Sequence, residues 1–238
     1  SRGLGDVYKR QDKDLHGAML SSANSINIGR LAPQVVYYFR AYGDLVKSGR
    51  IHLGDVVDYT VPTGNFGDIL AGYFARQMGL PVGRLICASN ANDVLTEFLT
   101  TGRYDKRRPF YKTVSPSMDI LVSSNLERLL YLLSGDDKLI ADLMKQLSEN
   151  GEYEVPADML EKLHELFWAG FCDDEGAKTA IGKVWKDDHY LCDTHTAVAW
   201  DVAQQYKQAN PEHNAVVVLS TASPYKFLSL IHISEPTR

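Results

Sequence analysis

The most constraining feature of the sequence is VPTGNFGDILAGYFA at residues 61–75, where an apolar run passes through a glycine-containing turn directly into a helical pattern. The preceding residues 55–61, DVVDYTV, are β-branched and apolar, which is typical of a buried strand. Gly64 and Gly67 permit close backbone approaches that a Cβ atom would block. Because the first N–H groups of a helix lack partners inside it and lie at its positive end, this turn predicts an anion-binding loop.

The loop lacks the signatures of the common nucleotide-binding turns. No GK[ST] follows Gly67, as a P-loop requires, and the dinucleotide pattern GxGxxG is also missing from this segment. A purely structural alternative stays open, in which the segment is a tight turn and Asp68 caps the helix. Because its charge would repel a bound anion, we expect Asp68 to cap backbone or to orient a neighbour.

Strand and helix patterns alternate along the chain. The periodicity predicts helices at 30–47 (starting or kinked near Pro33), 68–79, 92–100 and 193–208, helix-rich sections near 118–150 and 156–168, and strands at 55–61, 84–89 and 215–220. The leucines at 126, 129, 130 and 133 form an apolar stripe that is expected to face a core. This alternation predicts an α/β fold with a mostly parallel sheet and flanking helices.

Composition and charge exclude several classes of function. The 238 residues are 45% hydrophobic and 23% charged, as in ordinary globular proteins, and no apolar run reaches the roughly 18 residues of a membrane helix. The formal net charge of −5 and the absence of a basic stripe argue against a nucleic-acid partner. Cys87, Cys172 and Cys192 form no CxxC pair, which favours a reducing cytoplasm over disulfides or a zinc site.

The two ends of the chain stand apart from this pattern. Residues 1–11 (SRGLGDVYKRQ) and 229–238 (SLIHISEPTR) show no useful periodicity. Both resemble translated sequencing-adapter read-through, with natural tails as the alternative. We therefore expect non-native tails and leave both segments out of the fold argument.

Six stretches, in one order, resemble the threonine synthases. The segment VPTGNFGD resembles the phosphate-binding loop of that family, and the others are SANSINIGRL (22–31), ASNANDVLTEFLTTGRYD (88–105), SPSMDILVSSNLERLLY (115–131), DTHTAVA (193–199) and STASPYKF (220–227). The resemblance implies a fold type II pyridoxal 5'-phosphate (PLP) enzyme with tryptophan synthase β-like architecture. Such an enzyme converts O-phosphohomoserine and water into threonine and phosphate. Residues 12–228 would then be the C-terminal part of an incomplete PLP-binding catalytic domain.

The resemblance assigns cofactor-binding roles to individual positions. Gly64, Asn65, Phe66 and Gly67 would hold the PLP phosphate through backbone N–H groups and the Asn65 amide. Thr221 would face the pyridine nitrogen of the cofactor. Because a neutral hydroxyl stabilises a pyridinium less than a carboxylate does, that nitrogen would be protonated less often. The alternative for Thr221 is a strand-end residue that bonds to backbone.

Other positions are implied on the substrate side. Ser25, Asn27 and Arg30 would contact the substrate, because Ser and Asn donate to oxygens and arginine binds phosphate or carboxylate with two N–H groups. Helix capping and a surface arginine are the alternatives. His195, at a predicted helix start, could assist proton transfer near neutral pH, with capping or packing as the alternative. Asp119 is expected to be structural.

The chemistry also requires a lysine that binds the cofactor and moves protons. The resemblance places it upstream of residues 22–31, and no lysine of this chain, Lys226 included, falls in a matching motif. We therefore expect a fragment, monomeric or homodimeric, that is inactive alone and has open sheet edges and apolar faces that favour aggregation. Three alternatives stay open: a threonine-synthase-like phospho-lyase, another fold type II PLP lyase such as a dehydratase, and a non-catalytic anion-binding module.

Overall fold

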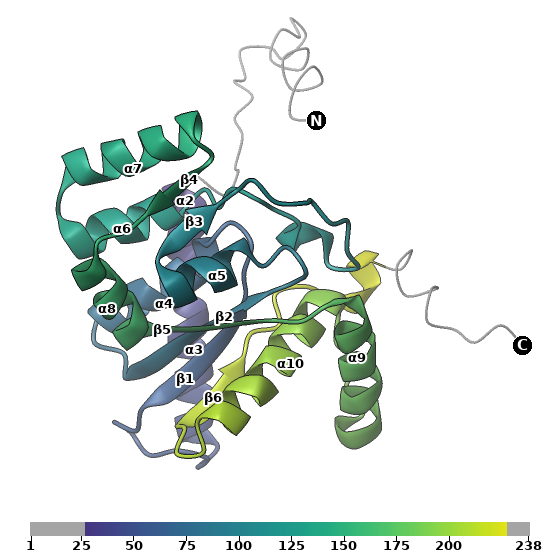
Figure 1. Ribbon diagram of the computed structural model, residues 1–238. Coiled ribbons are helices and arrows are strands. Elements are labelled where there is room, and N and C mark those ends of the chain that lie inside the picture. Colours follow the sequence, from purple (N-terminus) through teal and green to yellow (C-terminus); the bar gives the residue numbers. More distant parts are fainter. Residues whose placement is uncertain (1–26, 228–238) are drawn as a thin grey trace, which may run out of the picture.

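The computed structural model describes residues 27–227 (Figure 1). Its central feature is a parallel sheet with the strand order β5-β2-β1-β6. The strands are β1 (Val57–Pro62), β2 (Val82–Ser89), β5 (Phe167–Phe171) and β6 (Ala215–Val218). The predicted α/β class and parallel sheet are therefore confirmed.

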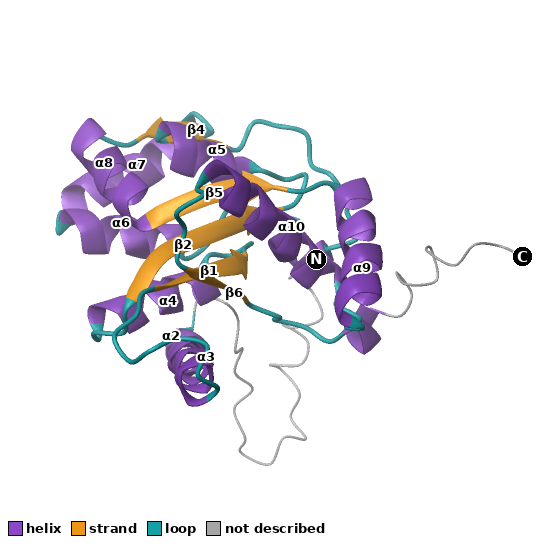
Figure 2. Ribbon diagram, turned by 90° about the horizontal axis from the view of Figure 1, so that it is seen from below, coloured by secondary structure: helices purple, strands orange, loops and turns teal. Residues whose placement is uncertain are grey.

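Helices cover both faces of this sheet, with α9 and α10 on one side and α3 and α4 on the other (Figure 2). These helices are α3 (Val35–Lys47), α4 (Gly67–Gln77), α9 (Asp174–Asp188) and α10 (Thr194–Ala209). Strand β2 shows why the strands are mostly apolar, since successive side chains point to opposite faces and both faces are covered. Leu85 and Cys87 belong to the core on the α4 side, whereas Ile86 and Ala88 belong to the core on the α10 side.

The first described helical segment is broken near Pro33, as predicted. It consists of α2 (Ile28–Leu31), the 3-10 turn η1 (Ala32–Gln34) and α3. A proline has no N–H to donate and its ring excludes a regular preceding turn, which accounts for the break. Helix α3 then buries Tyr38 and Tyr42 against the core.

Most of the remaining elements lie around α6, α7 and α8 beside the sheet, whereas η3 lies next to α9 (Figure 1). They are α5 (Val94–Thr101), β3 (Arg103–Asp105), η2 (Pro116–Met118), α6 (Leu126–Ser134), α7 (Asp137–Glu149), β4 (Glu152–Glu154), α8 (Ala157–Leu166) and η3 (Pro224–Phe227). Strands β3 and β4 pair antiparallel, and their rings Tyr104 and Tyr153 stack with centroids 5.2 Å apart. Leu126, Leu129 and Leu130 of α6 are buried, which confirms the predicted core stripe.

The structure corrects the predicted pattern at α8 and α9, and adds the short strands β3 and β4, which were not predicted. The helix predicted at 156–168 ends at Leu166, and the next residue begins β5 with extended backbone angles (φ −118°, ψ 151°). The stripe of apolar residues on α8 continues into Phe167, so helical spacing masked the start of the strand. Helix α9 was not predicted, because the buried residues recorded for it are only Ala177, Ala180 and Val184.

The connections of β1 create a crevice at the carboxyl edge of the sheet. Strand β1 leads through α4 to β2, whereas its other neighbour, β6, is reached through α10 on the opposite face. The starts of α4 and α10 flank this edge from opposite faces of the sheet, and ligands of parallel α/β sheets bind in the crevice outside the carboxyl ends of the strands. Thr60 of β1 pairs with Val218 of β6, so residues 63–66 and 219–222 leave the sheet side by side.

Several predictions lie outside the described residues. They are the non-native tails at 1–11 and 229–238 and the substrate role of Ser25. Among the helices of residues 27–227, none combines the length and apolar character that a membrane crossing demands.

Candidate functional site

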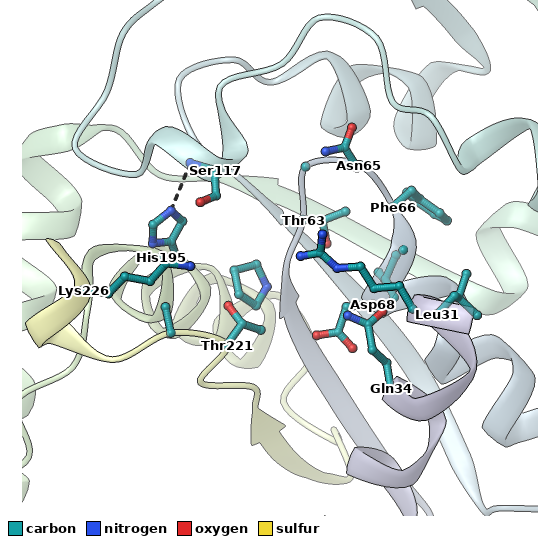
Figure 3. Close-up of a pocket in the computed structure, with 16 residues that line it drawn as sticks. Leu31, Gln34, Thr63, Asn65, Phe66, Asp68, Ser117, His195, Thr221 and Lys226 are labelled. Atoms are coloured by element: carbon teal, nitrogen blue, oxygen red, sulfur yellow. Dashed lines mark hydrogen bonds between the residues drawn. The ribbon is translucent and has the colours of Figure 1, made fainter. Parts of the chain in front are cut away.

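A pocket of about 250 Å³ occupies the crevice at the carboxyl edge of the sheet (Figure 3). Its walls come from α2, η1, the loop after β1, the start of α4, η2, α10 and the segment after β6. The lining residues are Arg30, Leu31, Gln34, Pro62, Thr63, Gly64, Asn65, Phe66, Gly67, Asp68, Ile69, Ser117, His195, Thr221, Ala222 and Lys226. Residues far apart in the sequence therefore meet in one cavity.

Most of the residues singled out in the sequence line this pocket. The loop 64–67, Thr221, Arg30 and His195 all contribute to its walls. Asn27 has a different place in the structure: its side-chain oxygen accepts the N–H of Gly29 at 2.9 Å and caps α2. The structure thus brings the predicted cofactor-binding positions and Arg30 together, and puts Asn27 at a helix terminus.

The loop 64–66 has the backbone geometry of an anion-binding cradle. A Cβ atom on Gly64 would lie 2.8 Å from the carbonyl oxygen of Ser117, so only glycine fits there without a shift. Phe66 adopts the left-handed conformation (φ 61°, ψ 12°), which is typical of concavities where successive N–H groups converge. Within residues 27–227, the N–H groups of Gly64, Asn65 and Phe66 donate to no protein atom, which suits them to hold a phosphate.

Asp68 lies at the start of α4 beside this cradle. The Tyr38 hydroxyl donates to the Asp68 carbonyl oxygen at 2.8 Å and lies 3.4 Å from the carboxylate oxygen Oδ1. Burial raises the pKa of Asp68 to about 6, although the hydrogen bond from Tyr38 lowers it in part. The N-cap residue of α4 is Phe66, without a side-chain cap, so the structure does not show the capping role. Asp68 instead contacts Tyr38, in line with the expectation that it orients a neighbour.

His195 is buried between α10 and η2, with 3% of its surface exposed. Its Nε2 accepts the N–H of Ser117 at 3.2 Å, and its Nδ1 lies 2.9 Å from Oδ1 of Asp193. An acceptor Nε2 implies a neutral ring whose Nδ1–H donates to the carboxylate. Burial would raise the pKa of Asp193, but hydrogen bonds from His195 and Thr196 outweigh it and lower that pKa. This geometry holds η2 against α10, and proton transfer by His195 stays a prediction.

A buried polar network holds the segment before η2 in place. The Asp119 carboxylate accepts from Asn90 Nδ2 at 2.8 Å, from Asn92 Nδ2 at 3.1 Å and from Thr113 Oγ1 at 2.7 Å. Asn90 and Asn92 are almost fully buried, so these bonds satisfy amide groups that water does not reach. Asp119 therefore has the structural role expected for it, one step removed from the pocket.

Sequence reasoning gave no site role to several polar residues of the pocket, Thr63 among them. Gln34, Ser117 and Lys226 all line it, and Lys226 lies on the same side as Thr221 and His195 (Figure 3). Lys226 had a signal in the sequence, because it follows Thr221 within one motif. Ser117 likewise lies in the motif 115–131, whereas Gln34 lies in none, and only the tertiary fold brings η1 and η2 to the loop after β1.

The described residues contain no cluster of side chains suited to a metal ion, and their cysteines are buried. In the range 27–227, no group of three or more His, Cys, Asp or Glu side chains is arranged to hold a metal ion. The three cysteines are unbridged and buried. Burial raises the pKa of Cys87 to about 12, so its thiol stays protonated and unreactive near neutral pH.

Comparison with known proteins identifies relatives for nearly the whole chain. No family model matches the sequence. "Threonine synthase-like 1" of Macaca fascicularis is 46% identical over 218 residues, which are 91% of this chain and 29% of the relative. "Threonine synthase" of Pseudomonas aeruginosa is 41% identical over 214 residues, 90% of this chain and 44% of the relative. The chain thus spans less than half the length of these curated relatives.

Solved structures give the same result for the fold. The crystal structure of PLP-bound threonine synthase from Brucella melitensis matches with a TM-score of 0.83 and 40% identity, covering 96% of this chain and 48% of that one. Yeast threonine synthase matches with a TM-score of 0.82 and 32% identity, covering 96% and 47%. The fold type II architecture implied by the resemblance is therefore confirmed. Over about nine tenths of its length, this chain is a homologue of the threonine synthases and threonine synthase-like proteins.

Proposed function

We propose that this chain is part of a PLP-dependent threonine synthase, which converts O-phosphohomoserine and water into threonine and phosphate. The observation that carries the proposal is the cradle at residues 64–66, whose N–H groups donate to no protein atom of residues 27–227. The cradle opens into a pocket that Thr221 also lines. A phosphate offers several acceptor oxygens to such N–H groups at a helix start. The similarity to PLP-bound threonine synthase supports PLP as the phosphorylated ligand.

The residues of the loop after β1 and of the segment after β6 would hold the two ends of PLP. The N–H groups of Gly64, Asn65 and Phe66 bind its phosphate, with Gly67 at the positive end of α4. The Thr221 hydroxyl meets the ring nitrogen on the opposite wall. When bound, PLP supplies an electron sink that stabilises negative charge on a substrate carbon. The protein contributes binding, orientation and exclusion of water.

Two cations of the pocket are suited to bind an anionic substrate. Arg30 lies on α2 and Lys226 on η3, and both side chains line the cavity. O-phosphohomoserine carries a phosphate and a carboxylate, which are the groups that guanidinium and ammonium bind. We therefore propose substrate contacts for Arg30, and retain Ser25 and Asn27 as further candidates from the same segment.

We also propose that the lysine that binds PLP covalently lies in a part of the relatives that this chain does not match. No lysine of the chain falls in a motif that the family resemblance would assign to that role, Lys226 of the pocket included. The 238-residue chain would then bind PLP without a covalent bond and would not turn over O-phosphohomoserine. With its buried, unbridged cysteines, the enzyme would act in a reducing cytoplasm.

Calorimetry on the 238-residue chain tests the cofactor proposal. We expect PLP and inorganic phosphate to bind, and pyridoxal, which lacks the phosphate, to bind at least about tenfold more weakly than PLP, because charge-assisted hydrogen bonds contribute about 1.5–3 kcal/mol each. Equal affinity for PLP and pyridoxal would contradict phosphate recognition. Incubation with O-phosphohomoserine and PLP should release no phosphate; threonine formation would show that the chain is active by itself.

The position of the PLP-binding lysine is tested in a longer protein that contains this sequence. Borohydride reduction with bound PLP, followed by peptide mapping, should label a lysine outside the 238 residues. Labelling of Lys226 would contradict that assignment. If PLP binds but no lysine is labelled, the chain belongs to a non-catalytic anion-binding module instead.

A threonine-synthase-like phospho-lyase is the second candidate. It is favoured by one observation, the higher identity to threonine synthase-like 1 (46%) than to the threonine synthase of Pseudomonas aeruginosa (41%). Product analysis of the longer protein separates the two reactions. Threonine supports the first proposal, whereas an oxo-acid and ammonia together with phosphate support the second.

A further inference from the structure

We propose that Ser123 and Asn125 are positioning residues that aim the phosphate-binding N–H groups into the pocket, by holding the carbonyl oxygens of the loop on its opposite side. This inference deepens the proposed function and rests on it. It concerns the residues just before α6, to which sequence analysis assigned no role.

The contacts between the two segments are short and specific. Asn125 donates twice to the Asn65 carbonyl oxygen, from Nδ2 at 2.8 Å and from its backbone N–H at 3.1 Å. Ser123 Oγ donates to the Gly64 carbonyl oxygen at 2.9 Å. Asn125 is fully buried and Ser123 nearly so, so water does not compete for these carbonyls. Two consecutive peptide groups of the loop are therefore fixed from one side.

Peptide geometry turns these contacts into an orientation. In a planar trans peptide, the carbonyl oxygen and the N–H of the next residue point in opposite directions. Holding the Gly64 oxygen toward Ser123 therefore directs the Asn65 N–H away from Ser123. In the same way, holding the Asn65 oxygen directs the Phe66 N–H away from Asn125. Residues 64–66 line the pocket, and neither Ser123 nor Asn125 is among its described lining residues, so both N–H groups point toward the cavity side.

The backbone of Phe66 needs such support. Its left-handed conformation is disfavoured for a residue with a Cβ atom and persists where the surroundings determine it. The peptide before Phe66 is held by both hydrogen bonds from Asn125. The Phe66 ring also packs against the Phe167 ring, with the ring centroids 5.7 Å apart. Rotation of that peptide would turn its N–H out of the pocket and replace it with a carbonyl oxygen, which repels phosphate.

The Asn125 side chain bonds to the loop and does not cap its own helix. Asn125 occupies the N-cap position of α6, yet its side chain forms no capping hydrogen bond there. Its Oδ1 instead accepts from Arg128 Nη1 at 3.0 Å. Because Oδ1 accepts from the guanidinium, Nδ2 is the atom that faces the Asn65 carbonyl oxygen, as an amide donor should.

Isosteric and truncating variants of the 238-residue chain test the proposal by calorimetry with PLP, inorganic phosphate and pyridoxal. We expect Asn125→Ala to weaken the binding of PLP and of phosphate at least tenfold and to leave the binding of pyridoxal unchanged. Ser123→Ala should change the affinities in the same direction. Asn125→Asp keeps the size of the side chain but replaces the donor with an oxygen, so we expect at least the same loss. If Asn125 only fills space, Asn125→Asp would bind PLP like the wild type, and the proposal would be wrong.

Asp136→Ala is the matched control. Asp136 caps α7 with hydrogen bonds from the N–H groups of Lys138 and Leu139, so the variant also loses two bonds, at the far end of α6 from the loop. It should bind PLP like the wild type. If Asp136→Ala weakened PLP binding as much as Asn125→Ala does, the effect would be general destabilisation and the proposal would be wrong.

A second measurement separates this inference from the proposed function. Amide resonances of isotopically labelled protein report the Asn65 and Phe66 peptides without any ligand. Asn125→Ala should shift these two resonances more than Asp136→Ala does. If the wild type bound neither PLP nor phosphate, the proposed function would fail, while unshifted Asn65 and Phe66 resonances in Asn125→Ala would separately refute the positioning role.

Discussion

At the scale of single residues, Gly64 is the position where the loop tolerates least change. A Cβ atom there would lie 2.8 Å from the Ser117 oxygen and 3.2 Å from the Met118 Cα, and backbone atoms cannot rotate out of the way. We expect Gly64→Ala to lower the free energy of unfolding by about 1–3 kcal/mol, as in other overpacked sites, and to weaken PLP binding. Urea denaturation and calorimetry measure the two effects.

Gly43 provides the control for that substitution. It lies in α3, and a Cβ atom added to it would meet nothing within 4 Å. Gly43→Ala should raise the free energy of unfolding by about 0.5–1 kcal/mol, because alanine loses less backbone entropy in a helix. A Gly64→Ala protein with the stability and PLP affinity of Gly43→Ala would show that the loop has room for a side chain.

The raised pKa of Asp68 makes stability depend on pH. Its pKa rises from an ordinary value of 3.8 to about 6 on folding, so between about pH 4 and pH 6 the folded protein retains a proton that the unfolded chain releases. The contribution of Asp68 to the free energy of unfolding therefore falls as pH rises through this window. Asp68→Asn cannot ionise, so its stability relative to the wild type should increase from pH 4 to pH 6.

Urea denaturation at several pH values measures that difference. The Asn variant keeps the hydrogen bond from Tyr38 to the backbone carbonyl of residue 68, which limits other effects of the substitution. A constant difference between the two proteins from pH 4 to pH 7 would show that Asp68 titrates alike in the folded and unfolded states.

Individual site residues were predictable only where their chemistry was local. Gly64–Gly67 stood out because a strand, a turn and a helix follow one another there, and these residues line the pocket. Ser117 and Asn125 lie in the motif 115–131, but no strand, turn and helix pattern around them indicates what they contact. Asn125 is sixty positions from the carbonyl that it contacts, and no local pattern encodes a bond across that separation.

At the scale of elements, the segment 113–119 depends on one carboxylate. Asp119 satisfies the buried amides of Asn90 and Asn92 and fixes Thr113. Asp119→Ala removes these hydrogen bonds and the acceptor of the Thr113 N–H, which donates to Asp119 Oδ2 at 3.0 Å. We therefore expect it to lower the free energy of unfolding by about 1–3 kcal/mol, measured by urea denaturation. Asp119→Asn retains one oxygen acceptor, so its free energy of unfolding should fall by less. Equal loss in both variants would assign the effect to the charge and not to hydrogen bonding.

Elements with one clear period were predicted, and those with a mixed signal were not. Strand β1 and helix α4 each bury a continuous set of side chains, so their patterns were plain. Strand β5 follows α8 without a turn residue between them, and its first residue, Phe167, fits the helical spacing of α8. Helix α9 buries small residues beneath a charged surface, which leaves little periodicity to recognise.

At the scale of the whole molecule, the alternation of elements determines the class but not the order of the strands. Nothing in the pattern of β6 indicates that it pairs with β1 and not with β5, because pairing depends on which faces α4 and α10 cover. That choice creates the crevice in which the pocket lies. The site could therefore be predicted as a set of motifs, while its walls follow only from the packed fold.

The packed fold also leaves an apolar area on its outer surface. Ile28, Val36 and Met78 are more than half exposed, and together with Phe74 they line a shallow groove on α2, α3 and α4. Exposed apolar areas of this kind favour association of copies. We expect the 238-residue chain to self-associate, with a mass that rises with concentration in analytical ultracentrifugation, and the double variant Val36→Lys, Met78→Lys to shift that equilibrium toward monomer.

Leu53→Lys is the matched substitution for this experiment. Leu53 is 84% exposed and lies in the loop between α3 and β1, away from the groove residues. It adds the same kind of charge without altering the groove, so it should leave the association unchanged. If Leu53→Lys dissociates the copies as well as the double variant does, net charge and not the apolar groove controls association. A wild-type chain that stays monomeric at every concentration would show that the groove is too small to hold two copies together.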